Sequence, residues 1–281
     1  MSPERRPIVL CADDFGISDG VNRGILRLAR AGRLSASGSM ANLPAFRRGA
    51  PALKELAGTV GLGLHLTLTA GAPLGPMPRL APAGRLPPLG RLIALALVGR
   101  LDGGEIQGEI ERQCDAFTAA VGRPPDFVDG HQHVHVLPGI RGALLAVLAA
   151  RRLDGRIWLR DPADRPASLL ARPSAAKATV VAGLAAGFRG AAARAGFRTN
   201  RGFSGFSDFT AGGNVAEAFE RAFERPGPAP VVMCHPGEID DELRGLDAVV
   251  ESRPLELAYL ASSRFAEFLA RERFRLVARP A

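Results

Sequence analysis

Short apolar runs alternate with amphipathic helices along most of the chain, and this alternation limits the possible fold more than any other feature. The predicted strands span residues 6–12, 34–40, 59–69, 127–129, 156–160, 230–234 and 274–278. The predicted helices span residues 19–31, 45–57, 105–121, 139–150, 174–195, 215–223 and 255–271. Strands that alternate with helices form parallel βα units, whose functional groups gather at the carboxyl ends of the strands. We therefore expect an α/β fold with its site along that edge.

Two segments depart from this alternation. Residues 71–90 are rich in proline and glycine and lack periodicity, which predicts a long loop near the active face. Residues 162–210 combine an alanine-rich helical stretch with a glycine- and phenylalanine-rich run that predicts a loop over 196–209. The length of 281 residues is near the upper size for one hydrophobic core. We expect a single catalytic domain over residues 1–281, with loop or lid insertions near 70–100 and 161–212.

Three of the five histidines lie close together, as His131, His133 and His135. If the strand that begins at Phe127 continues, its period of two places these three imidazoles on one face. Protonated imidazoles at such spacing would repel one another, so the arrangement suits neutral nitrogens around a cation. A solvated polar turn or a hydrogen-bonded cluster in the core would give the same pattern.

The other two histidines and an acidic pair also lie at predicted strand ends. Asp13 and Asp14 follow the first strand, His65 lies near the end of the third, and His235 follows residues 230–234. Two histidines and one carboxylate that leave open positions commonly hold a catalytic divalent metal. In the acidic pair, one carboxylate can ligate the metal while its neighbour accepts a proton, and a cation between them would relieve their repulsion. An Asx-type turn that caps the following helix is the alternative.

Four motifs at these positions resemble those of one protein family. They are A-D-D-F-G at residues 12–16, G-L-H-L-T-L-T at 63–69, D-G-H-Q-H-V-H-x-x-P at 129–138 and M-C-H-P-G at 233–237. Together and in this order, they resemble the YdjC-like carbohydrate deacetylases, which include chitooligosaccharide deacetylases and hopanoid-associated members. The sequence departs from the family pattern at Cys11, Gly130 and Gln132, where Asn, Ser and His are common. None of these departures removes a ligand.

This resemblance implies a fold and an activity. The fold would be a distorted, incomplete (β/α) barrel of the polysaccharide-deacetylase-like kind. The activity would be that of a metal-dependent hydrolase, which removes an acetyl group from an N-acetylated sugar and releases acetate and a free amino sugar. The resemblance is also compatible with a homodimer.

The resemblance also implies roles for individual residues. The metal ligands would be Asp14, His65 and His131, with Asp13 as general base and His235 as general acid. Three further residues are expected to support the site or contact the substrate, namely His133, His135 and Arg160. One divalent ion is expected, with Mg²⁺ or Zn²⁺ favoured and Mn²⁺ or Ni²⁺ as alternatives.

Other functions remain open at this point. A metal-dependent phosphoesterase or glycosidase on a similar barrel is one alternative, and a non-catalytic, metal-dependent sugar-binding protein is another. A glycosidase needs two carboxylates about 5–9.5 Å apart on either side of the sugar bond, whereas Asp13 and Asp14 are adjacent. Arg160 also has an alternative, a surface ion pair with Asp161 or Asp164.

The net charge of +8 does not by itself indicate nucleic-acid binding. Lys54 and Lys177 are the only lysines among 36 basic residues, and no aromatic interleaving or nucleic-acid motif accompanies the arginines. Residues 151–201 contain ten arginines, one lysine and three aspartates, so their formal charge is +8, equal to that of the whole chain. This segment can meet an anionic ligand or a membrane surface, where the substrate would be lipid-linked, or it can be a solvated basic face.

No segment is typical of a targeting or membrane-spanning element. The apolar run at 8–12 is too short for a signal peptide, and the run at 92–98 is far below the roughly 20 residues that span a bilayer. Cys11, Cys114 and Cys234 are widely spaced and odd in number, which predicts reduced, buried thiols. We expect a cytoplasmic protein.

Overall fold

The structure is a computed structural model that describes residues 5–207 and 214–280. Its strands are β1 (Arg6–Phe15), β2 (Ala36–Ser39), β3 (Gly61–Leu66), β4 (Phe127–Gly130), β5 (Trp158–Leu159), β6 (Arg198–Thr199), β7 (Phe203–Ser204), β8 (Val231–Cys234) and β9 (Phe274–Leu276). Its helices are α1 (Asp19–Arg30), α2 (Pro44–Lys54), α3 (Leu89–Leu97), α4 (Gly103–Val121), α5 (Ile140–Ala150), α6 (Pro166–Ala171), α7 (Ala175–Leu184), α8 (Phe188–Arg194), α9 (Val215–Ala222), α10 (Asp241–Leu246), α11 (Arg253–Ala261) and α12 (Ser263–Arg271). A 3₁₀ turn, η1, spans His131–Val136.

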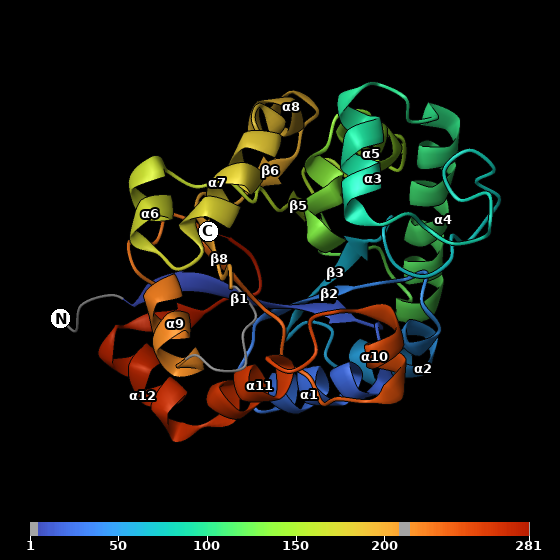
Figure 1. The fold of residues 1–281 in the computed structure, drawn as a ribbon. Coiled ribbons are helices and arrows are strands. Elements are labelled where there is room, and N and C mark those ends of the chain that lie inside the picture. Colours follow the sequence, from blue (N-terminus) through green and yellow to red (C-terminus); the bar gives the residue numbers. More distant parts are fainter. Residues whose placement is uncertain (1–4, 208–213, 281) are drawn as a thin grey trace.

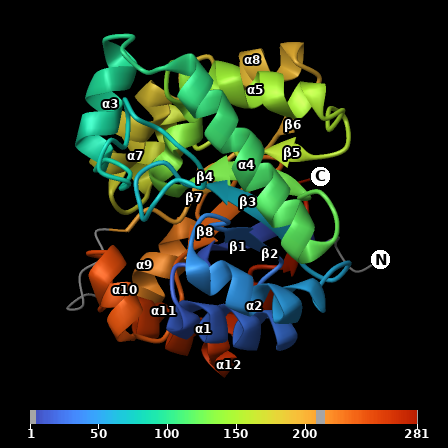
Figure 2. The same cartoon turned by 90° about the vertical axis from the view of Figure 1, so that its right-hand side faces the viewer.

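The sheet curls into an incomplete barrel whose strand pairs are all parallel. Its order is β6-β5-β4-β3-β2-β1-β8-β7, and β9 pairs with the first residues of β1. Within residues 5–207 and 214–280, no ladder joins β6 to β7, so the barrel is open between them. Helices α1, α2, α11 and α12 lie on one side of the sheet, and α3, α4 and α5 lie on the other (Figures 1 and 2). The predicted α/β class and the distorted, incomplete barrel are confirmed.

Strand β1 is central, and its composition explains why. It pairs with β2 on one edge and with β8 and β9 on the other. Every residue from Ile8 to Phe15 is buried, because helices cover both faces of the sheet at this strand. A parallel strand covered on both faces is expected to be apolar, as β1 is from Ile8 to Ala12. The carboxylates of Asp13 and Asp14 therefore lie in the interior and not on a solvated loop.

Cap residues explain where α1 and α4 begin and where α4 ends. Ser18 accepts a hydrogen bond from the backbone N–H of Val21 at the start of α1, and Asp102 accepts one from Glu105 at the start of α4. Such caps satisfy amide donors that have no partner inside the helix. Gly122 ends α4 with a φ of 84°, a left-handed conformation that glycine adopts without steric cost.

Several predicted boundaries were wrong, for local reasons. The helix predicted over 174–195 is two helices, because Gly187 turns the chain with a φ of 80° between α7 and α8. The helix predicted over 255–271 breaks at Ser262, whose hydroxyl accepts from the N–H of Phe265 and so begins α12. The loop predicted over 196–209 contains the short strands β6 and β7. Residues 208 and 209 of that loop lie outside the described residues.

The long loop after β3 packs against α4. The carboxylate of Glu109 accepts from the N–H of Leu74, and that of Glu105 accepts from the N–H groups of Arg79 and Leu80. These bonds hold residues 74–80 of the first predicted insertion, near 70–100, against α4. The second predicted insertion, near 161–212, includes α6, α7 and α8, while its residues 208–212 lie outside the described part. The single-domain organisation over 1–281 stays a prediction, supported by a sheet that draws strands from both ends of the chain.

Two further expectations concern cysteines and membranes. Cys11, Cys114 and Cys234 are buried free thiols, as predicted. Across residues 5–207 and 214–280, the helices are too short or too polar to cross a bilayer.

Candidate metal centre and active site

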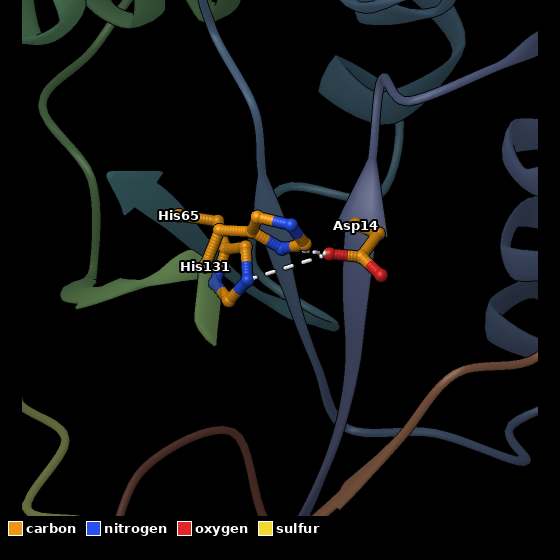
Figure 3. A group of neighbouring side chains, drawn as sticks. All are labelled: Asp14, His65 and His131. Atoms are coloured by element: carbon orange, nitrogen blue, oxygen red, sulfur yellow. Dashed lines mark hydrogen bonds and ion pairs between the residues drawn. The ribbon is translucent and has the colours of Figure 1, made fainter. Parts of the chain in front are cut away.

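Three predicted ligands meet at the carboxyl edge of the sheet. Asp14 is in β1, His65 is in β3, and His131 begins η1 directly after β4. The Nδ1 atom of His131 lies 3.0 Å from Oδ1 of Asp14, and Nε2 of His65 lies 3.4 Å from the same oxygen. One ligand atom from each residue falls within 4.8 Å of the others, and all three residues are buried. Figure 3 shows both imidazoles directed at the carboxylate from separate segments.

A local irregularity in β1 lets two successive carboxylates serve one cavity. Neighbouring residues of a regular strand point to opposite faces. The register between β1 and β2 shifts between Ala12 and Phe15, and Asp14 has a φ of 69°. Aspartate tolerates this left-handed conformation better than most residues. Asp13 and Asp14 consequently both line the same pocket, and the Asx-turn alternative is not needed to explain the pair.

Asp129 orients His65, and our sequence reasoning did not assign it a role. The register of β3 and β4 places His65 opposite Asp129. Oδ1 of Asp129 lies 2.7 Å from Nδ1 of His65, which leaves Nε2 directed at Asp14. A carboxylate behind a ligand histidine fixes the ring tautomer and orientation. Its position two residues before His131 in the D-G-H-Q-H motif was the available signal.

Arg160 binds Asp13 from the side that faces away from the pocket. Its Nη1 and Nη2 each donate to Asp13 at 2.6 Å, and Nη2 also lies 2.7 Å from Oδ2 of Asp129. The side chain is 0% exposed and does not line the pocket. The alternative of a surface pair with Asp161 or Asp164 is wrong, because those carboxylates pair with other arginines. The buried guanidinium contacts Asp13 and lies behind it, outside the lining of the pocket.

A second buried arginine, which our sequence reasoning missed, holds Asp14. Nη2 of Arg253 donates to Oδ2 of Asp14 at 2.7 Å and to Asp247 at 2.6 Å. Burial alone would raise the pKa of Asp14, but Arg253 and His131 hold it well below its usual range. Asp14 is therefore ionised, as a metal ligand must be. Nη1 of Arg253 has no hydrogen-bond partner within the described residues, and the side chain lines the pocket.

His235 lines the pocket, and Glu256 supports it from outside the pocket lining. His235 follows β8 and lines the pocket, and its backbone N–H donates to Oε2 of Glu256 at 2.6 Å. Burial lowers the pKa of the His235 imidazole to about 4, against the opposing charges of Asp14 and Asp13. Burial likewise raises the pKa of Glu256 to about 7. The imidazole is therefore neutral in the free site at neutral pH.

The expectation that three histidines share one strand face is wrong. Strand β4 ends at Gly130, and Gln132 and His133 have φ values of 53° and 61° inside η1. The twofold alternation is lost at that turn, so only His131 reaches the Asp14 carboxylate. His133 lines the pocket and packs edge-on against aromatic rings. His135 is buried below the pocket floor and donates from Nε2 to the carbonyl of Arg160 at 2.7 Å.

The pocket combines a polar floor with aliphatic walls. Its volume is about 460 Å³. The floor holds Asp13, the three predicted ligands, His235 and Arg253. The walls come mainly from α3, α7 and the loops around them, and their aliphatic members are Leu89, Ile93, Val136, Leu137, Val180, Val181, Leu184, Met233 and Val249. A substrate can thus place one polar group at the floor while its remainder meets apolar side chains.

Comparison with known proteins identifies the family. The model of the YdjC-like protein family matches residues 7–271. The chain belongs to this family. A chitooligosaccharide deacetylase of Yersinia pestis (strain Pestoides F) is 31% identical over 269 residues, which are 96% of each chain. One from Enterobacter sp. (strain 638) is 37% identical over 145 residues, which are 52% of this chain and 56% of that one.

A solved structure supports the fold of this YdjC-like protein. A protein of Enterococcus faecalis V583, provisionally assigned to cellobiose-phosphate cleavage, superposes with a TM-score of 0.72 at 21% identity. The match covers 98% of this chain and 97% of that chain. At that identity, the likeness shows the fold alone.

The donor set of the YdjC-like site fits a divalent metal. One ionised carboxylate and two imidazole nitrogens converge on one point, and one side of the group faces the pocket. Such a set leaves positions for water and substrate. Burial would lower the pKa of His65, but Asp129 and Asp13 raise it to about 10, so a metal has to displace a proton from this ring when it binds.

Proposed function

We propose that the protein is a metal-dependent carbohydrate N-deacetylase, which hydrolyses the acetamido group of an N-acetylated sugar to acetate and an amine. The observation that carries this proposal is the group Asp14, His65 and His131 beside an Asp13 that Arg160 clamps, all at the floor of one pocket. The names of the chitooligosaccharide deacetylases to which the chain is similar support it. Asp14, His65 and His131 would hold the metal.

Asp13 would be the general base. A bound divalent ion would lower the pKa of a water molecule and polarise the acetyl carbonyl. Asp13 lies beside the ligand Asp14 and lines the pocket, so it can accept the proton of the attacking water. The two hydrogen bonds from Arg160 fix the plane of this carboxylate, which holds its lone pairs in one direction throughout the reaction.

His235 would be the general acid. It follows β8, whereas Asp13 is in β1, so the pocket presents a base and a proton donor from different elements. Negative charge that develops on the acetyl oxygen raises the pKa of a nearby imidazole. This change would allow His235, which is neutral in the free site, to acquire a proton and deliver it to the departing sugar nitrogen.

The pocket walls favour a substrate with an apolar part. Among the pocket-lining residues, the walls offer aliphatic side chains and no phenylalanine, tyrosine or tryptophan on which a sugar ring could stack. We propose that the acetamido sugar is linked to a lipid, whose first carbons contact α3 and α7. His133 and the free Nη1 of Arg253 would contact the hydroxyl groups of the sugar.

The remaining predictions are finer. One carboxylate with two imidazoles suits Zn²⁺ or Mg²⁺, with Mn²⁺ or Ni²⁺ as alternatives, and metal analysis of the purified protein would decide among them. A cytoplasmic location and a homodimer stay predictions, which cell fractionation and analytical ultracentrifugation would test.

The experiment is an acetate-release screen over N-acetylated mono- and oligosaccharides and their lipid-linked forms. Each substrate would be assayed with and without chelator, and after the metal is restored. We expect release that chelator abolishes and metal restores. Release of phosphate or of a reducing sugar instead would assign the site to a phosphoesterase or a glycosidase. Stoichiometric sugar binding without turnover would assign it to a binding protein.

A further inference from the structure

Two segments beside the pocket carry basic residues and no acidic ones. Residues 71–101 contain four arginines and neither aspartate nor glutamate. Residues 165–201 contain six arginines and Lys177, again without an acidic residue. The rest of the chain holds 25 basic and 28 acidic residues. The formal positive charge is therefore concentrated in these two segments, where Arg79, Arg172 and Arg189 are ion-paired with neighbouring aspartates and the other basic residues add to the positive charge.

The exposed aliphatic side chains lie in the same two segments. Five large hydrophobic residues are exposed within the described part of the chain, and four of them belong here: Leu97 (61%), Val98 (66%), Leu170 (74%) and Val180 (65%). In α7 only Ala178 is buried, and in α3 only Leu92 and Ala96 are. Both helices therefore direct apolar side chains away from the core, which a water-exposed helix does not usually do.

The two segments meet at the entrance of the pocket. Leu89 and Ile93 of α3 and Val180 and Leu184 of α7 line the same cavity, and α6 packs against α7. Both views place α3 and α7 on the side of the sheet opposite α1 and α12 (Figures 1 and 2). We call the exposed residues of α3, α6 and α7, together with Val98 and Arg100, the rim surface.

We propose that the rim surface docks the protein on a bilayer that contains anionic lipids, with the pocket mouth toward the lipid. Aliphatic side chains next to basic residues are the features of a peripheral membrane-binding surface. Charge complementarity favours this occupant over a second copy of the chain, because a twofold contact through the rim surface would bring like charges together. It also differs from a nucleic-acid surface, where aromatic side chains would stack on bases.

The proposal goes beyond the deacetylase function and can be tested without any substrate. Binding of purified protein to vesicles would be measured by co-sedimentation. The vesicles would be phosphatidylcholine alone, or phosphatidylcholine with phosphatidylglycerol. Each would be tested at low and at high ionic strength, because salt screens exposed charges beyond about 10 Å at 0.1 M. We expect binding to the anionic vesicles at low salt, and its loss at high salt.

Two double variants address the two features of the rim surface. R91Q/R100Q removes two positive charges and should weaken partitioning about 25-fold, at about fivefold for each arginine. L97S/V98S should weaken it about tenfold, because less apolar surface enters the lipid. The matched controls lie on the opposite side of the sheet: R27Q/R30Q in α1, and L255S at the 38%-exposed residue of α11. The controls should bind vesicles as the unmodified protein does.

Several results would overturn the proposal. One is the absence of binding to anionic vesicles at low salt, and another is equal weakening in the control variants. Binding to RNA or DNA that L97S/V98S leaves unchanged, without binding to vesicles, would assign the basic segments to nucleic acid. Self-association that L97S/V98S abolishes, again without vesicle binding, would assign the rim surface to a second copy. Acetate release plays no part in these measurements, so the two proposals fail separately.

Discussion

Replacement of Asp129 by asparagine should weaken metal binding without removing a ligand. Asp129 is fully buried, accepts from Nδ1 of His65 at 2.7 Å and forms an ion pair with Arg160 at 2.7 Å. Asparagine keeps the size of the side chain and one oxygen, but it carries no charge. The imidazole of His65 then loses the carboxylate that fixes its tautomer and raises its basicity.

The size of the effect follows from that role. Loss of a carboxylate behind a ligand histidine typically costs 10- to 100-fold in metal affinity, by general experience with such sites. This corresponds to about 1.4–2.7 kcal/mol of binding free energy. Arg160 keeps its two hydrogen bonds to Asp13, so it is not left as an isolated buried charge. The free energy of unfolding should fall by about 1–3 kcal/mol.

The assay is a competition titration of the apoprotein against a chromophoric chelator, with urea unfolding to show that the variant is folded. The matched control is Asp126→Asn. Asp126 precedes the same strand, but it bonds to Arg123 and to the N–H of Leu62 and leaves His65 untouched. Unchanged metal affinity in folded Asp129→Asn would refute the role of Asp129. An equal loss in Asp126→Asn would refute it too, because the effect would then be a general one on the strand.

Three other predictions follow from the same site. Asp13→Asn should retain the metal and lose about 10²- to 10⁴-fold in turnover. His131→Ala should lose both the bound metal and turnover, and full metal content in this variant would contradict the ligand role of His131. Arg160→Lys should lower kcat more than metal affinity, because an ammonium cannot make the paired bonds to Asp13; a change in metal affinity alone would contradict this. Burial raises the pKa of Glu256 from 4.5 to about 7, so the folded protein favours the protonated carboxyl. Protonation of Glu256 therefore contributes about 3 kcal/mol to the free energy of unfolding at low pH, and this contribution is lost as the pH rises from 4.5 through 7. Glu256→Gln should remove that loss, and an unchanged difference in urea stability between pH 5 and pH 8 would contradict the assignment.

The residues that meet at the site could be predicted because their positions depend on strand order and not on exact boundaries. Asp14, His65 and His131 each follow or end a strand that the apolar pattern predicts, and parallel strands bring their carboxyl ends to one edge. An error of two or three residues in a strand boundary does not change that edge. Strand β3 is shorter than predicted, for example, and still places His65 in the site.

The local path of the chain could not be predicted in the same way. The period of two placed His131, His133 and His135 together only if the strand continued, and two residues with positive φ end that pattern. Neither Gln132 nor His133 is a residue whose identity requires such a conformation. The bulge at Asp14 is likewise set by tertiary packing. Arg253 was missed because it lies 239 residues from Asp14 in the sequence and nothing in its neighbourhood indicates a partner.

The adjacent carboxylates show why the two buried arginines matter. From the sequence, we expected a bound metal alone to relieve the repulsion between Asp13 and Asp14, since two carboxylates this close need a cation nearby. In the structure each carboxylate has its own guanidinium: Arg160 holds Asp13, and Arg253 holds Asp14. Each carboxylate is therefore paired with a cation before a metal binds, and the two arginines come from different parts of the chain. Arg160 bonds to both oxygens of Asp13, whereas His65 and His131 face Asp14. Under the proposed function, this arrangement would separate the proton acceptor from the ligand although the two residues are neighbours in sequence.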